Sequence, residues 1–176
     1  MGQYYKGVVG NKIYDNYLIY KGEKKYTLAK LMEHSYINNL WVNTIAKQIY
    51  KNPQKVAWVG DYSNECTSVF DKLDVSYEDV WNTDGDVLKY ARFSCKKRYL
   101  VNHTTEEYVA MGKMPIKDGW QLHPLPLLTA VGNGGGGGDY YGKDEEYVGC
   151  WAGDVLSVED EPPMEYSEVT FDFEPY

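Results

Sequence analysis

The segment from Gly132 to Gly142 has the composition that most directly suggests chemistry. It reads Gly-Asn-Gly-Gly-Gly-Gly-Gly-Asp-Tyr-Tyr-Gly. Glycine lets a backbone approach a ligand closely and adopt positive φ, and successive amide N–H groups in such a loop can form an anion-binding nest. This glycine run therefore predicts either a flexible surface loop or a loop that is ordered around a nucleotide or a partner.

In the ordered alternative, the side chains of the run would supply polar contacts and a stacking ring. The apolar stretch before the run and the aromatic residues after it favour this alternative. The expected ligand-binding residues are Asn133, Gly134, Gly136, Asp139, Tyr140 and Tyr141. Two nucleotide-binding motifs are excluded, because no βαβ unit follows the run and because Lys143 is followed by Asp144 instead of Ser or Thr.

A second set of residues could perform acid–base catalysis. His123 precedes Pro124 and could carry a proton beside the glycine run. Asp61, Asp139 and Asp154 each lie at a turn next to an apolar stretch, where they could converge on a metal ion or act as acid and base groups. Turn formation also explains these aspartates and needs no such role. The candidate catalytic residues are thus His123, Asp61, Asp139 and Asp154.

Neither a metal site nor a cofactor is predicted. Cys66, Cys95 and Cys150 are widely spaced and form no CxxC pair, and the three histidines are scattered. Odd, dispersed cysteines argue against both a disulfide framework and a zinc site.

Charge divides the chain into two parts. Residues 139–176 hold twelve carboxylates and one lysine, a net charge of −11, whereas residues 1–138 hold seventeen basic and fourteen acidic side chains, a net charge of +3. The acidic C-terminal part disfavours direct binding to nucleic acid and favours a basic partner, including a nucleic-acid-binding protein. A solvated surface that aids solubility is the alternative.

The chain of 176 residues suits one globular domain spanning 1–176. No apolar run reaches the length of a membrane span, and the start lacks a secretion signal, so we expect a cytoplasmic protein. Its 18 tyrosines suit half-buried sheet faces or an interface. The oligomeric state stays open.

The pattern of apolar residues predicts an α+β domain with a largely antiparallel sheet and one main amphipathic helix. The helix is expected over residues 37–50, with Leu40, Trp41, Ile45 and Ile49 on one face and Asn38 or Asn39 as its cap. Strands are expected at 3–9, 12–21, 55–60, 98–103, 107–111, 119–124, twice within 146–158, and at 169–173. Ser76 and Asp79 predict a capping box, and Pro124 and Pro126 predict an edge or extended connection.

Several blocks together resemble a family of uncharacterised proteins from gut bacteria, actinobacteria and their phages. They are the MGQYYK start, YLVNHT at 99–104, HPLPLLTAVGNG at 123–134 and VGCWAGD at 148–154. The likeness covers nearly the whole chain. In the family pattern an arginine stands inside the glycine run where this chain has Gly135. We therefore do not expect an arginine of the run to bind a phosphate or a carboxylate in this protein.

The resemblance and the charge pattern lead to one functional hypothesis and one alternative. The hypothesis is a phage or mobile-element accessory protein that inhibits a host defence system in the manner of an anti-CRISPR protein. It would block a nucleic-acid-binding effector or sequester a small nucleotide signal. The alternative is an enzyme that acts on a nucleotide-like substrate with its histidine and aspartates beside the glycine run.

Overall fold

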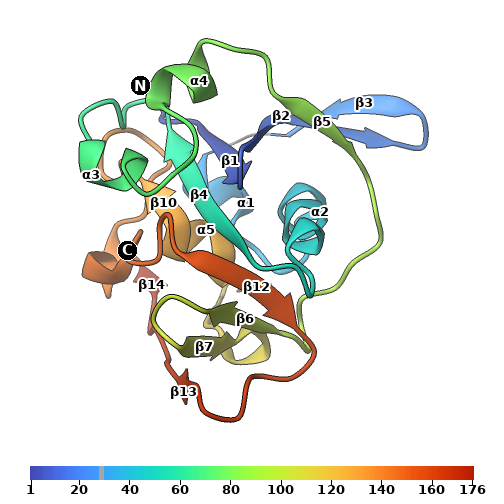
Figure 1. The fold of residues 1–176 in the computed structure, drawn as a ribbon, viewed down its shortest axis with the longest axis vertical. Helices are drawn as coiled ribbons and strands as arrows, with labels where there is room; N and C mark the ends of the chain where they lie inside the picture. The colour runs from blue at the N-terminus through green and yellow to red at the C-terminus, as the bar shows by residue number, and fades with distance from the viewer. Residues whose placement is uncertain (28–29) are drawn as a thin grey trace.

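The computed structural model describes residues 1–27 and 30–176. The strands are β1 (Tyr5–Val9), β2 (Lys12–Tyr20), β3 (Glu23–Tyr26), β4 (Gln54–Gly60), β5 (Asp86–Lys89), β6 (Tyr99–Asn102), β7 (Glu107–Ala110), β8 (Ile116–Lys117), β9 (Trp120–Gln121), β10 (Ala130–Val131), β11 (Gly142–Lys143), β12 (Val155–Glu159), β13 (Ser167–Glu168) and β14 (Glu174–Pro175). The helices are α1 (Leu31–His34), α2 (Leu40–Gln48), α3 (Thr67–Phe70), α4 (Tyr77–Trp81) and α5 (Pro124–Thr129), with 3-10 turns η1 (Met111–Lys113) and η2 (Glu145–Tyr147). The expected α+β class is confirmed (Figure 1).

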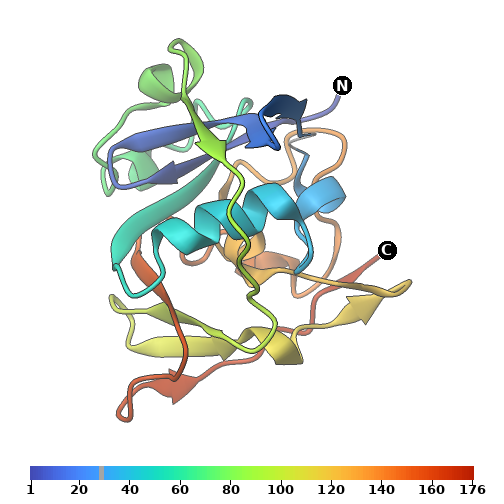
Figure 2. The same cartoon turned by 90° about the vertical axis from the view of Figure 1, so that its right-hand side faces the viewer.

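A mostly antiparallel sheet in the order β13-β7-β6-β12-β4-β1-β2-β3 organises the molecule. β4 lies at its centre and pairs with β1 along one edge. Along its other edge β4 pairs first with β12 and then, in parallel, with the short strand β10. Figure 2 shows α2 across the middle of the molecule, with the β1–β2 hairpin on one side and the β6–β7 hairpin on the other.

Both faces of β4 are buried, which explains its continuous apolar sequence. Val56 and Trp58 face one core, which also contains the buried side of α2 and most of α5. Ala57 and Val59 face a second core, against which residues of α3 and α4 pack. Alternate side chains of a strand point to opposite faces, so one strand holds the two layers together.

The main helix begins where the sequence predicts a cap. The Asn39 side chain accepts a hydrogen bond from Val42 N at 3.0 Å, and Trp41 and Ile45 are buried against the sheet. The prediction for Leu40 is wrong, because its side chain is 44% exposed and lines a groove. As the first residue of α2, Leu40 lies beyond the edge of the contact with the core.

The expected extended connection at Pro124 and Pro126 is wrong, because both prolines lie in α5. His123 is the N-cap, which places the two prolines in the first turn. The first N–H groups of a helix have no partner within the helix, so proline loses nothing there.

Two predicted strands are also absent. Residues 146–154 form η2 and a series of turns, and only β12 of the predicted pair exists. Residues 169–173 cross between β13, which pairs with β7, and β14, which pairs with β11. The alternation still predicts burial correctly at its last position, because Phe173 is 1% exposed.

Other local predictions are confirmed. β1 and β2 form a hairpin in which Val9 pairs with Lys12 across the predicted Gly10-Asn11 turn. Ser76 and Asp79 form the capping box of α4. In the part of the chain that the structure describes, no helix has the length and apolar character needed to cross a bilayer.

The pH dependence of stability follows from two buried histidines, His34 and His123, whose Nε2 atoms have no partner among the described residues. Burial lowers the pKa of His34 to about 4 and that of His123 to about 3. An unfolded histidine titrates near pH 6.5. Below this pH the unfolded state therefore binds protons that the folded state does not bind. The free energy of unfolding is highest above about pH 6.5 and decreases as the pH falls.

We predict that each histidine removes about 1.4 kcal/mol of unfolding free energy per pH unit between about pH 6 and 4.5. His123→Asn removes one of the two titrating groups but keeps a side-chain acceptor for Leu125 N. It should therefore abolish roughly half of the combined dependence of the unfolding free energy on pH. Urea unfolding at pH 7.5, 6.0 and 5.0 measures it. Identical slopes for the two proteins below pH 6 would contradict the prediction.

Candidate functional site

The glycine run reaches its place through the strand that precedes it. β10 runs parallel to β4, with Val131 opposite Val59, so the chain leaves β10 beside Gly60 and the turn at Asp61. β1 pairs with the opposite edge of β4, which brings the first residues of the chain to the same end of the sheet. A bridge between Gly2 and Gly137 joins the N-terminal segment to the run.

The Asp139 carboxylate lies inside the run and accepts four hydrogen bonds. Its Oδ2 accepts from Gln3 Nε2 at 2.6 Å, Gly134 N at 2.8 Å and Gly136 N at 3.0 Å. Its Oδ1 accepts from the Tyr5 hydroxyl at 2.7 Å. The run therefore does form an anion nest of amide groups, and the anion is a carboxylate of the protein itself.

The side chains around Asp139 are fixed in donor roles. Burial, and then the neighbouring Asp139 carboxylate, raise the pKa of Tyr5 far above its usual value, so its hydroxyl keeps its proton. Gln3 also donates to Gly132 O at 2.7 Å and accepts from Tyr62 N at 3.1 Å. Charge-assisted hydrogen bonds, such as those that Gln3 and Tyr5 make to Asp139, are roughly twice as strong as neutral ones.

The base of the run is closed by Asn133 and Tyr140. The Asn133 side chain donates to Tyr140 O at 3.0 Å and accepts from Tyr140 N at 2.8 Å. Tyr140 is fully buried, donates its hydroxyl proton to Lys143 O at 2.5 Å and packs edge-on against Phe173. The polar atoms of both residues are thus satisfied within the protein.

Close backbone approach explains Gly136, and a positive φ explains Gly138. A Cβ atom on Gly136 would lie 2.8 Å from Gln3 N and 3.0 Å from Met1 O. Gly138 has φ of +85°, and a Cβ there would meet the Lys30 side chain at 2.7 Å. Gly135, where the resemblance leads us to expect arginine, is exposed, and the nest around Asp139 closes without a cation from that position.

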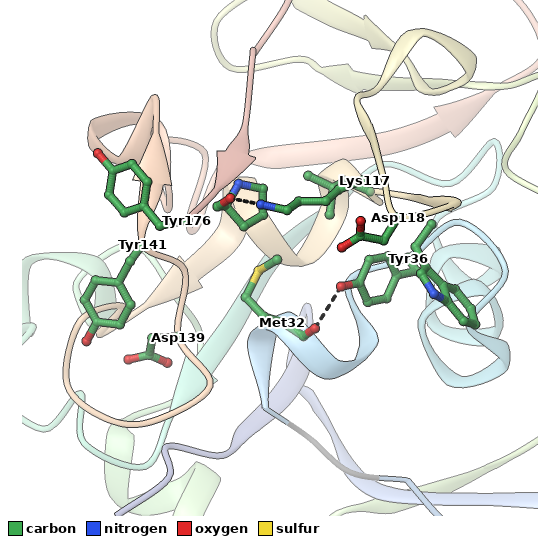
Figure 3. Close-up of a pocket in the computed structure, with 10 residues that line it drawn as sticks. Met32, Tyr36, Lys117, Asp118, Asp139, Tyr141 and Tyr176 are labelled. Carbon is green, nitrogen blue, oxygen red and sulfur yellow. Dashed lines mark hydrogen bonds between the residues drawn. The ribbon is translucent and has the colours of Figure 1, made fainter.

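Beside the run lies an open pocket of about 280 Å³. Its lining residues are Met32, Tyr36, Lys117, Asp118, Trp120, Leu122, Asp139, Tyr141, Pro175 and Tyr176. Figure 3 shows Asp139 and Tyr141 on one side and Tyr36 and Asp118 on the other. We call it the aromatic pocket.

Hydrogen bonds to the backbone hold the walls of the aromatic pocket together. Tyr176 N donates to Tyr141 O at 3.0 Å, and the Lys117 ammonium donates to Pro175 O. The Tyr36 and Trp120 rings lie 5.6 Å apart. Four aromatic side chains, together with Asp118, give the pocket the character of a site for an organic cation.

The structure brings together only some of the candidate catalytic residues. Asp61 and Asp139 are neighbours: burial raises the pKa of Asp61, and the Asp139 charge adds a smaller rise. Asp154 lies elsewhere, where it accepts from Asn102 Nδ2 at 2.9 Å and pairs with Lys72. His123 is fully buried at the cap of α5, where its Nδ1 accepts from Leu125 N at 3.1 Å.

None of the three thiols is activated as a nucleophile. Burial raises the pKa of Cys95 to about 12 and that of Cys150 to about 11, and the pKa of Cys66 is shifted in the same direction. A thiolate nucleophile requires a lowered pKa. Within residues 1–27 and 30–176, no three His, Cys, Asp or Glu side chains are grouped so that they could hold a metal ion.

Of the residues that line the pocket, only Asp139 and Tyr141 are among those predicted from the sequence; Tyr36, Asp118 and Trp120 are among those missed. Asp118 and Gly119 have φ of +51° and +82° in the turn between β8 and β9. An Asp-Gly pair between apolar residues is a strong hairpin signal, so the β8–β9 hairpin could have been predicted. No comparable signal places Tyr36 beside it.

Comparison with protein-family models, curated proteins and solved structures finds no match for this chain.

The nest makes a direct prediction about stability. Asp139→Asn removes one acceptor oxygen and turns an NH₂ group toward existing donors, so we expect the unfolding free energy to fall by about 3 kcal/mol. Urea unfolding measures it. Asp172→Asn, at an exposed carboxylate paired with Lys143, is the matched control and should cost less than about 0.5 kcal/mol. Equal effects of the two substitutions would refute the structural role of Asp139.

Proposed function

We propose that this protein binds a basic partner protein through the aromatic pocket and the acidic surface beside it. The observation that carries the proposal is the pocket itself, in which Tyr36, Trp120, Tyr141 and Tyr176 surround a space that Asp118 also lines. Aromatic faces and carboxylates together attract guanidinium and ammonium groups. Its one lysine, Lys117, already donates to a backbone carbonyl.

An acidic ribbon adjoins the pocket. It consists of Asp144, Glu145, Asp172 and Glu174, on and around the β11–β14 pair that leads into Pro175. Asp144 accepts from Asp172 N at 2.8 Å, and Lys143 is the one basic residue after position 138. Such a surface speeds the approach of a basic partner and fixes its orientation.

Three other carboxylates of the acidic C-terminal part are paired with basic side chains of the body of the protein. Asp160 pairs with Lys51 and Arg98, Glu168 pairs with Lys113, and Asp154 pairs with Lys72. The acidic ribbon, in which Asp172 pairs with Lys143, lies next to the aromatic pocket and adds to the attraction for a basic partner.

We further propose that the partner is a nucleic-acid-binding effector of a host defence system and that the protein acts in the cytoplasm of the host of a phage or mobile element. Carboxylates on the ribbon would occupy basic side chains that otherwise contact phosphates. The resemblance to proteins of bacteria and their phages supports this setting.

The other two hypotheses have less support. A nucleotide held by the glycine run would have to displace the Asp139 carboxylate from the amides of Gly134 and Gly136. A catalytic role for His123 would require a route to a fully buried ring. Neither arrangement has a geometric argument in its favour.

The binding proposal is tested by calorimetry with a nona-arginine peptide at low salt. We expect a dissociation constant below about 10 μM, roughly −7 kcal/mol, and a loss of at least about tenfold on Trp120→Ala. Tyr26→Ala, at an exposed aromatic on β3, is the matched control and should bind like the wild type. Equal losses for both variants, or no binding at all, would overturn the proposal.

A pull-down from host lysate then tests the kind of partner. The captured protein should bind nucleic acid alone and release it when this protein is added. If the Trp120→Ala variant captures the same protein, or if the captured protein has no affinity for nucleic acid, the proposed inhibition is contradicted.

A further inference from the structure

A second cavity, of about 550 Å³, lies between α2 and the connection from β5 to β6. Figure 2 shows this connection crossing in front of α2. We propose that this cavity, the basic groove, is a binding site for a nucleoside phosphate. The inference does not depend on the proposed function, because it concerns other residues and a ligand of opposite charge.

The charge of the basic groove comes from Arg92, Lys96 and Arg98, and no carboxylate belongs to its lining. Arg92 and Lys96 are exposed and pair with no carboxylate among the described residues. Two unpaired cations on one cavity wall attract a phosphate group, even though the protein as a whole carries a net charge of −8.

Arg98 is held in place by its neighbours. Its guanidinium lies 4.5 Å from the centre of the Phe93 ring and 4.9 Å from that of Tyr50. Its Nε donates to Asp160 at 3.0 Å, and another N–H donates to Ser94 O. Because guanidinium has five N–H donors, further donors remain for a phosphate while the group itself is already oriented.

The opposite wall offers a partner for a nucleobase. The Asn43 side chain on α2 is 6% exposed and lines the basic groove. Its Nδ2 donates to Ile37 O at 2.6 Å, but its Oδ1 has no hydrogen-bond partner among the described residues. A buried acceptor without a partner is unfavourable, and the exocyclic amine of a base would satisfy it once the amide turns toward the groove.

Apolar surface completes the base site. Leu40, the exposed member of the predicted helix stripe, lines the same groove, as do Tyr90 and Phe93. Aromatic and aliphatic faces stack on bases with little regard to sequence. The groove thus has a cationic end for phosphate and an amide with apolar neighbours for the base.

Calorimetry with the four common nucleoside diphosphates tests the proposal, with adenosine and inorganic pyrophosphate as part-ligands. At least one diphosphate should bind with a dissociation constant below about 1 mM and more tightly than either part-ligand. Absence of binding by all four, or pyrophosphate binding as tightly as the best diphosphate, would overturn it. If a single-stranded deca-adenylate binds more tightly than ADP, the proposal of a nucleoside phosphate site is overturned and the groove binds nucleic acid instead.

Variants assign the binding to the groove. Arg92→Ala and Lys96→Ala should each weaken the diphosphate at least about fivefold, and Asn43→Leu should reduce its affinity to that of pyrophosphate. Lys97→Ala is the matched control, because Lys97 is exposed but does not line the groove. A loss with Lys97→Ala as large as that with Arg92→Ala would refute the assignment. The melting temperature of each variant shows whether it is folded.

Discussion

The buried carboxylate of Asp139 is the contact on which the arrangement around the glycine run depends. It joins groups that lie more than 130 positions apart, because Gln3 and Tyr5 donate to it together with two amides of the run. Five consecutive glycines have a large conformational entropy when unfolded, and these four hydrogen bonds offset part of the cost of ordering them. The ordered run then supplies Tyr141 to the aromatic pocket.

The internal nest also changes the functional meaning of the glycines. Amides that point at a carboxylate of the same chain are not available to a phosphate from outside. Anion binding is instead favoured at the basic groove on α2, which has no carboxylate in its lining. The proposed sites thus divide by charge, with the aromatic pocket beside the acidic ribbon and the basic groove formed by Arg92, Lys96 and Arg98.

Local sequence patterns predicted the elements and caps that are determined by contacts between residues close in sequence. The apolar run of β4, the Asn39 cap and the Ser76–Asp79 capping box all depend on residues a few positions apart. Residues 169–173 show the limit of such patterns, because their alternation describes burial of Phe173 correctly but cannot say that the segment crosses between two small ladders. The prediction at Pro124 failed because the role of this proline depends on whether His123 caps a helix.

The candidate site could be predicted only in part. Composition alone drew attention to the glycine run, and Asp139 and Tyr141 do line the aromatic pocket. The partners of Asp139 at Gln3 and Tyr5 could not be read from the sequence, since they come near it only because β1 and β10 pair with opposite edges of β4. The basic groove is similarly non-local, because Arg92 and Asn43 meet through the path of the chain over α2.

Hydrogen exchange of the amides of Gly134 and Gly136, followed by NMR, tests the internal nest most directly. Protection of these two amides is the result that the structure predicts. Exchange of Gly134 and Gly136 at the rate of an unstructured chain would show that the run is a flexible linker and would contradict its ordering by Asp139.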